Sequence, residues 1–353
     1  MSADAAVASP GIAQDLRALR VYRYAMGSTI AMGVALGINW PLSYMVPMLS
    51  LSFLATPDPC PTLKRGLSFV AVVAGAVLFG TLLAAWLLPF PLVFVPLVTL
   101  VLFRIFYAKA SGSSPLLVMW LMIAVLVIPL VTMLSPGMAV VVAFGLVGGA
   151  AATILMVWIT YLFFPDPPGV SEVAAEAAAP PAPELPSPRE RFRAAVETTL
   201  VVAPVFVLFY TLQLADSILI LIFIALLSSQ PGFAQSYKGG VALIMGNVIG
   251  GMGAIIFYNL LIFVPEFYFM LMLTLLFGLI FSGQLFSGKK TAPLFGMAFS
   301  TVLLVVGSST TSTDEAGSAV YTRVIQIMVA VVYVVTAFGA IRGFRGVREA
   351  KRA

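Results

Sequence analysis

The feature that most constrains this chain is a series of apolar runs, each about as long as a membrane is thick. Residues 66–88, 115–134 and 137–164 contain no charged residue, and a helix needs about 20 apolar residues to cross the hydrocarbon core. The chain is 61% hydrophobic and only 9% charged, whereas soluble domains carry about 25% charged residues. The runs lack the alternation of barrel strands. The sequence therefore predicts an all-α polytopic membrane protein.

Pro, Gly and Asn residues divide the apolar sequence into about twelve predicted transmembrane helices, six on each side of a Pro-rich segment. The connections within hairpins are short, which predicts antiparallel neighbours. The predicted spans are 22–39, 41–56, 66–88, 91–108, 114–134 and 137–164 in the first half, and 197–215, 217–230, 239–262, 265–286, 291–307 and 317–341 in the second.

The basic residues predict the orientation of these spans. Apart from Arg104 and Arg323, which lie deeper within spans, the Lys and Arg residues, 17 of the 19, fall on one side of the predicted bundle. Loops rich in Lys and Arg stay in the cytoplasm. We therefore expect both termini in the cytoplasm, as an N-terminal segment, 1–21, and a basic tail, 342–353. The loops on the other side carry acidic residues instead: Asp216, Glu266, Asp314 and Glu315.

The chain divides into two predicted six-helix bundles, 22–164 and 191–341, joined by a cytoplasmic linker at 165–190 that is rich in Pro, Ala and Glu. Such a linker buries little apolar surface and is typical of an extended segment. The bundles resemble each other: placing Pro57 on Pro231 also places Lys64 on Lys238. These matches favour two repeats of parallel topology, related by an axis along the membrane normal. Chance matches between two Pro- and Gly-punctuated bundles are the alternative.

The residue inventory excludes several kinds of chemistry. There is no His, and the single Cys60 allows no intramolecular disulfide. No phosphate-binding Gly-rich loop is present, and no Asp or Glu lies at mid-span. We therefore predict a protein that is not an enzyme, holds no cofactor or metal and binds no nucleic acid. A membrane-embedded enzyme would need acid–base groups that this sequence lacks.

The second helix of each predicted bundle is the strongest pointer to a binding site. Spans 41–56 and 217–230 cover only about 21–24 Å, against about 30 Å of hydrocarbon. Short or Pro-broken helices at matching positions of two repeats indicate a transporter site. The alternative is two ordinary short helices. The candidate substrate-binding residues at their ends are Ser52, Thr56, Ser228 and Gln230.

Two arginines and a few amides add candidates for substrate binding. Arg104 is either a fixed cation for an anionic solute or a side chain that reaches the cytoplasmic interface. Arg323 shares a helix face with Gln326 and Tyr333. This polar stripe in an apolar helix indicates either a solute-binding site or structural pairing of Arg323 with an acidic residue of the outer loops. Asn247 lies within a span and is a further pathway candidate, although most such amides form interhelical hydrogen bonds.

Acidic residues that could couple transport to protons are few. Glu197 lies at the cytoplasmic start of the seventh span, and Asp216 lies in an outer hairpin. Both are candidate coupling residues.

This plan resembles the fusaric acid resistance and aromatic acid exporter family of bacterial inner membranes. The residues that carry the resemblance are Arg20 to Ile38, the Pro57–Gly66 stretch and the glycines of the third span, with a weaker repeat at 230–250. The family implies export of small aromatic or carboxylic acids, or related toxic compounds, beside a periplasmic membrane fusion (adaptor) protein. Its larger members carry cytoplasmic domains that this chain lacks, as a compact subgroup does.

The residues and the resemblance together predict a bacterial inner-membrane transporter that exports small organic anions, driven by an ion gradient. A passive organic-anion channel is one alternative, because plant anion channels are similar to this superfamily. An accessory subunit of an efflux assembly is another. A homo-oligomer is compatible with either transporter or channel.

Overall fold

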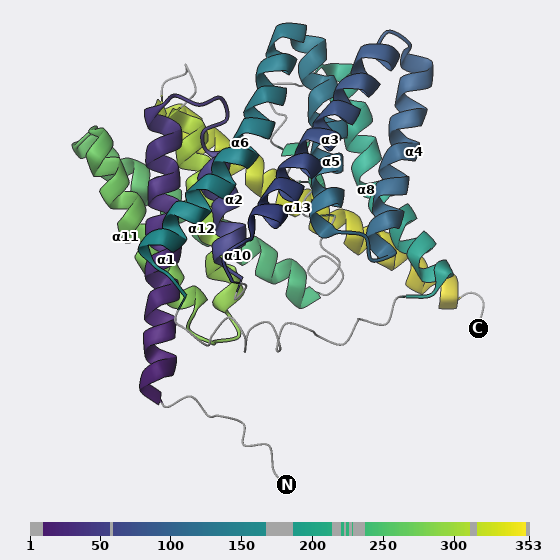
Figure 1. Cartoon of the computed structure of the whole chain (residues 1–353). Coiled ribbons are helices and arrows are strands. Elements are labelled where there is room, and N and C mark those ends of the chain that lie inside the picture. The colour runs from purple at the N-terminus through teal and green to yellow at the C-terminus, as the bar shows by residue number, and fades with distance from the viewer. Residues whose placement is uncertain are drawn as a thin grey trace.

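The computed structural model describes residues 10–56, 59–166, 186–213, 220–221, 224–225, 228, 237–310 and 316–350, and every element in them is a helix. The prediction of an all-helical polytopic membrane protein is confirmed. The helices before the linker are α1 (Pro10–Gly37), α2 (Met45–Leu54), α3 (Leu63–Leu87), α4 (Pro91–Ala110), α5 (Pro115–Leu134) and α6 (Pro136–Phe163). Those after it are α8 (Pro188–Leu212), α10 (Tyr237–Phe263), α11 (Phe267–Leu285), α12 (Ala292–Thr310) and α13 (Ala316–Ala350). Figure 1 shows their arrangement.

Nine helices of the described residues are long and apolar enough to cross a membrane: α3, α4, α5, α6, α8, α10, α11, α12 and α13. Three of the predicted spans are not among them. Helix α1 has 28 residues, but Arg20 and Arg23 interrupt its apolar part. Helix α2 has only 10 residues, fewer than the predicted 41–56. Most of 217–230 lies outside the described residues.

The short length of α2 has a local cause. Asn39 and Leu42 have φ angles of 50° and 58°, in the left-handed region that ends a helix. The chain therefore leaves α1 at Gly37 and makes a tight turn before α2 begins. After α2 the chain turns into α3, where the side chain of Thr62 caps the N-terminus of α3 by accepting a hydrogen bond from the backbone N–H of Arg65.

Close helix packing within each half depends on small residues. In the first half α3 packs on α5, and in the second half α10 packs on α12. A Cβ at Gly80 would lie 2.7 Å from the carbonyl oxygen of Ala124, and a Cβ at Gly250 would lie 2.6 Å from that of Ala298. Only glycine allows these two backbones to approach so closely.

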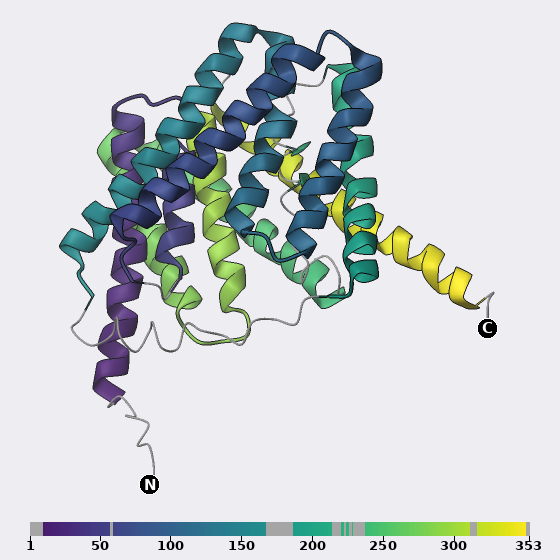
Figure 2. The same ribbon diagram turned by 45° about the vertical axis from the view of Figure 1, so that its right-hand side comes forward.

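The two halves of the chain interlock. Helix α1 packs on α11, and α8 packs on α4, so the first helix of each half lies against a helix of the other half. Figures 1 and 2 show α4 beside α8 in both views. They also show the first turns of α1 and the last turns of α13 projecting beyond the other helices.

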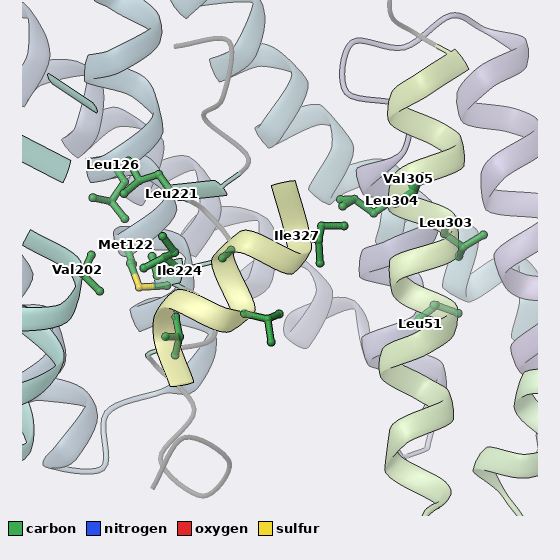
Figure 3. Packing of buried hydrophobic residues seen from close by; sticks show 14 of the residues in the cluster. Leu51, Met122, Leu126, Val202, Leu221, Ile224, Leu303, Leu304, Val305 and Ile327 are labelled. Atoms are coloured by element: carbon green, nitrogen blue, oxygen red, sulfur yellow. The ribbon is translucent and has the colours of Figure 1, made fainter. Parts of the chain in front are cut away.

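Helices α5 and α12 form the centre of the molecule, since two thirds of each apolar window (67%) is buried. Helix α2 packs on α1, α6 and α12. Figure 3 shows Leu51 of α2 beside Leu303 of α12, and Leu221 and Ile224 beside Leu126 and Met122 of α5. Helix α2 and the described residues Leu221 and Ile224 thus lie against central helices.

Candidate functional site

Helix α12 presents a buried polar face to its neighbours. The hydroxyl of Thr301 lies 3.1 Å from Oδ1 of Asn247 on α10 and 3.0 Å from the carbonyl oxygen of Met297. Thr301 and Asn247 are each only 4% exposed. Ser308 follows Thr301 by seven residues, or about two helical turns, and is also buried. The polar face therefore extends along α12 through an otherwise apolar interior.

A third helix adds a buried amide to this region. Helices α10, α12 and α13 pack on one another, and a Cβ at Gly251 of α10 would lie 3.0 Å from Val324 of α13. Gln326 of α13 is 9% exposed. Three mutually packed helices thus carry three buried polar side chains, Asn247, Thr301 and Gln326. Polar groups at membrane depth face protein or a water-filled cavity.

The start of α2 meets the other end of α12. The backbone of Gly307 lies directly against Tyr44. The neighbouring Ser43 is 1% exposed, and its hydroxyl has no hydrogen-bond partner in the part of the chain that the structure describes. Ser228, in the predicted second short span, is 4% exposed and its hydroxyl is likewise unpartnered among the described residues.

An unsatisfied buried hydroxyl costs about 1–3 kcal/mol, so such groups call for a physical explanation. Each of the two short spans carries one of them. A solute or water that enters between the helices would supply the missing partner. This observation supports the short spans as lining of a pathway, at Ser43 and Ser228.

The structure separates the remaining predicted substrate residues. Ser52 and Thr56 are exposed and donate hydrogen bonds to carbonyl oxygens of their own helix, those of Leu49 and Phe53. The buried serine of α2 is Ser50 instead. The hydroxyl of Tyr333 donates to the carbonyl oxygen of Val201 on α8 at 3.0 Å, which joins α13 to α8. The position of Gln230 and the side chain of Arg323 lie outside the described residues.

Arg104 is exposed on α4, next to the buried Leu102, Ile105 and Phe106. An exposed face of a transmembrane helix favours the interpretation that its guanidinium reaches the interface. Of the two interpretations of Arg104, the exposed position is the one expected of a side chain that reaches the cytoplasmic interface. Of the two coupling candidates, Glu197 lies 3.4 Å from Arg193, one turn earlier on α8, and Asp216 lies outside the described residues.

Sequence reasoning treated Arg23 only as a cytoplasmic charge, but the structure buries it to 6% exposure. Its guanidinium lies 2.8 Å from the carboxylate of Asp166 and donates to the carbonyl oxygen of Phe164 at 2.6 and 3.1 Å. It also lies 4.1 Å from the ring centroid of Tyr161. These contacts join α1 to the C-terminal end of α6. The sequence signal that could have identified Arg23 as a buried residue was its position within the predicted span 22–39.

Cys60 lies in the connection between α2 and α3, close to this charge cluster. The indole N–H of Trp158 on α6 donates to the carbonyl oxygen of Pro61 at 2.7 Å and holds the connection in place. Burial raises the pKa of the Cys60 thiol; the Asp166 carboxylate raises it further, and Arg23 lowers it. Among the described residues, no group of three or more Cys, Asp and Glu side chains could hold a metal ion.

Comparison with known families divides the chain at the linker. Residues 201–337 match the family described as "Fusaric acid resistance protein-like". Residues 20–163 match a family described as "Protein of unknown function (DUF2955)". No curated protein and no solved structure matches the chain. The resemblance to the fusaric acid resistance family is thereby confirmed for the second half of the chain, and the nine apolar helices among the described residues indicate a multi-pass membrane protein.

Proposed function

We propose that this chain, whose second half is a fusaric acid resistance protein-like domain, exports small organic anions across the bacterial inner membrane. The proposed substrates are aromatic or other carboxylic acids and related toxic compounds. The observation that carries the proposal is the set of buried polar side chains on three mutually packed helices, Asn247, Thr301 and Gln326. In hydrocarbon such groups are costly and are associated with solute pathways.

The proposed transporter consists of two six-helix repeats. The pairing of helices supports this arrangement, because α1 packs on α11 just as α8 packs on α4, and α3 packs on α5 just as α10 packs on α12. A rotation about an axis along the membrane normal would exchange these pairs. In transporters built in this way, solute sites lie between the repeats near the bilayer midplane.

The proposed pathway passes the buried face of α2 and Ser228 and continues along α12. Ser43 and Ser228 support it, because their buried hydroxyls have no hydrogen-bond partner among the described residues. Apolar side chains of Leu, Ile, Val and Met lie between the central helices (Figure 3). A solute can therefore pass only when the halves move relative to each other, as alternating access requires.

The proposed energy source is an ion gradient, since the sequence contains no nucleotide-binding loop. Glu197 and Asp216 are the proposed proton-coupling residues, and Arg323 is the proposed solute cation. We place both termini in the cytoplasm and propose a periplasmic adaptor as partner. These assignments rest on the sequence analysis.

The test is the accumulation of labelled aromatic and aliphatic acids in cells with and without the protein and a co-expressed adaptor. Asn247→Leu is the informative variant, and Asn259→Leu is the matched control. Asn259 lies on the same helix but is exposed, and its amide donates to its own helix at Ile255. We expect lower accumulation of some acids with the wild type and the control, and loss of that effect in Asn247→Leu at equal membrane levels.

If no acid shows reduced accumulation in these cells, the export proposal is wrong. A voltage-driven, uncoupled anion current in liposomes would instead identify a passive channel. Equal activity of Asn247→Leu and Asn259→Leu would remove α10 and α12 from the pathway while leaving export itself intact.

A further inference from the structure

A cavity lies on the outside of the bundle, between α1 and α11. Its volume is about 510 Å³, and its lining consists of Arg17, Ala18, Val21, Tyr22 and Leu279. Helices α1 and α11 pack on each other along their length. The hydroxyl of Ser282 on α11 donates to the carbonyl oxygen of Val21 on α1 at 3.3 Å and joins the two helices at the level of the cavity.

A single positive charge stands at the end of this cavity. The guanidinium of Arg17 donates to the carbonyl oxygen of Gly283 on α11 at 3.0 Å, which fixes its position against the helix end. A guanidinium has five N–H donors, so most of them stay available to an anion. Lys289 and Lys290 are exposed in the connection that follows α11 at the same end of the bundle, and they make the local potential more positive.

The rest of the lining is apolar and continues into the membrane-facing side of α11. Val21 and Leu279 are half-buried. Beyond Leu279, the exposed side chains of Met272, Leu276 and Ile280 follow one another at helical spacing along α11. Tyr22 is 52% exposed, and tyrosine is typical of the level where lipid head groups meet hydrocarbon.

We propose that this cavity, named here the α1–α11 groove, binds an anionic phospholipid of the leaflet on the side of the basic loops. The lipid phosphate accepts hydrogen bonds from Arg17, and an acyl chain lies against Val21, Leu279 and the exposed side of α11. A cation at the head-group level above an apolar wall fits this ligand, and basic pockets between helices on the cytoplasmic side bind such lipids.

The lipid site is independent of the proposed export function. It requires only that the helices lie in a membrane, and its lining residues belong to α1 and α11 rather than to α12. A failure to export any acid would leave it unchanged, and its own failure would leave export unchanged.

The test uses the purified full chain in detergent, titrated with dioleoyl phosphatidylglycerol and, separately, with dioleoyl phosphatidylcholine. Native mass spectrometry counts the bound lipids. We expect the wild type to retain phosphatidylglycerol in preference to phosphatidylcholine. Arg17→Ala should weaken phosphatidylglycerol binding by about tenfold or more, because a charge-assisted hydrogen bond is lost. Arg104→Ala, which removes an exposed arginine outside the groove, should leave binding unchanged.

Leu279→Trp provides a second variant that keeps Arg17 and fills the apolar part of the groove. It should also weaken binding, since the acyl chain loses its space. The proposal is overturned if Arg17→Ala binds phosphatidylglycerol as the wild type does, or if both lipids bind equally. Displacement of the lipid by millimolar inorganic phosphate or benzoate would likewise overturn it and assign the groove to a free anion.

Discussion

At the scale of single residues, the buried arginine of α1 is the group whose environment matters most. Arg23 interacts with a carboxylate, a carbonyl oxygen and an aromatic ring, all at the end of α6. Taking a guanidinium out of water is costly unless its partners replace the lost hydration. The three partners together provide that replacement, and they connect the first and last helices of the first half.

Replacement of Arg23 should therefore destabilise the fold. For Arg23→Met we expect the free energy of unfolding to fall by about 3–5 kcal/mol, because the Asp166 carboxylate is left without its partner. Denaturation by sodium dodecyl sulfate in mixed micelles, followed by circular dichroism, measures the change. The matched control Arg104→Met should change stability by less than about 0.5 kcal/mol. Equal losses in the two variants would contradict a structural role for the Arg23 contacts.

The exposure of Arg104 on α4 leads to a second prediction, which compares it with Arg323. Arg104→Ala should leave acid accumulation unchanged, since the side chain is exposed on α4. Arg323→Ala should abolish the difference between expressing and control cells, if Arg323 is the proposed solute cation. The accumulation assay described above measures both. A loss of export in Arg104→Ala at normal membrane levels would restore Arg104 as a substrate residue.

The thiol of Cys60 allows a test of the same charge cluster. Burial and the Asp166 carboxylate raise its pKa, so at neutral pH it carries less thiolate than a free cysteine and reacts more slowly with maleimide. Asp166→Asn removes one of the causes that raise the pKa. We expect the midpoint of the rate–pH profile to move to lower pH in this variant. A midpoint that stays or rises would show that the carboxylate does not act on the thiol.

At the scale of helices, the closest contacts are glycine on backbone. Gly80 of α3 faces the carbonyl of Ala124, and its added Cβ would meet backbone atoms at 2.7 and 2.9 Å. Backbone atoms of a packed helix cannot move aside as a flexible side chain can. The separation of α3 from α5, and of α10 from α12, thus depends on single glycines.

Gly80→Ala and Gly75→Ala form a matched pair on α3. A Cβ at Gly75 would meet nothing within 4 Å. We expect Gly80→Ala to lower the free energy of unfolding by about 1–3 kcal/mol, as overpacking does, and Gly75→Ala to be neutral or slightly stabilising. The detergent denaturation described above compares them. Indistinguishable variants would show that α3 and α5 are farther apart than the structure places them.

At the scale of the whole molecule, the two halves contact each other through two helix pairs, α1 with α11 and α8 with α4. Each half on its own would expose the faces that these pairs bury. The chain therefore forms one membrane unit, although its two halves match two different families.

The orientation of this unit can be measured through Cys60, the single cysteine of the chain. We expect a membrane-impermeant maleimide to label it in inverted vesicles and to leave it unlabelled in intact cells. The variant Cys60→Ser with Glu266→Cys should show the reverse pattern, because Glu266 lies in an acidic connection on the other side. Labelling of Cys60 from outside would invert the proposed orientation.

The sequence by itself determined the properties that depend on local composition. Apolar runs determined the membrane class and the helices from α3 to α6, because burial of a backbone in lipid leaves few alternatives to a helix. The family resemblance was confirmed in the second half, at 201–337, where the sequence repeats the pattern more weakly. The Pro57–Gly66 stretch and the glycines of α3, which carried most of the resemblance, lie in the half that matches a family of unknown function. The interhelical hydrogen bond between Asn247 and Thr301 was also of a predictable kind, since an amide within a span usually bonds to a neighbouring helix.

Only the tertiary structure decided what depends on which faces meet. Helical periodicity places Arg23 and Arg104 within spans but does not tell which neighbour lies opposite, so the burial of one and the exposure of the other could not be predicted. The same holds for Ser43 and Ser50 as the buried serines in place of Ser52 and Thr56, and for the groove at Arg17. Contacts such as Thr301 with Asn247 join residues that are 54 positions apart, and packing between helices, rather than sequence near either residue, brings them together.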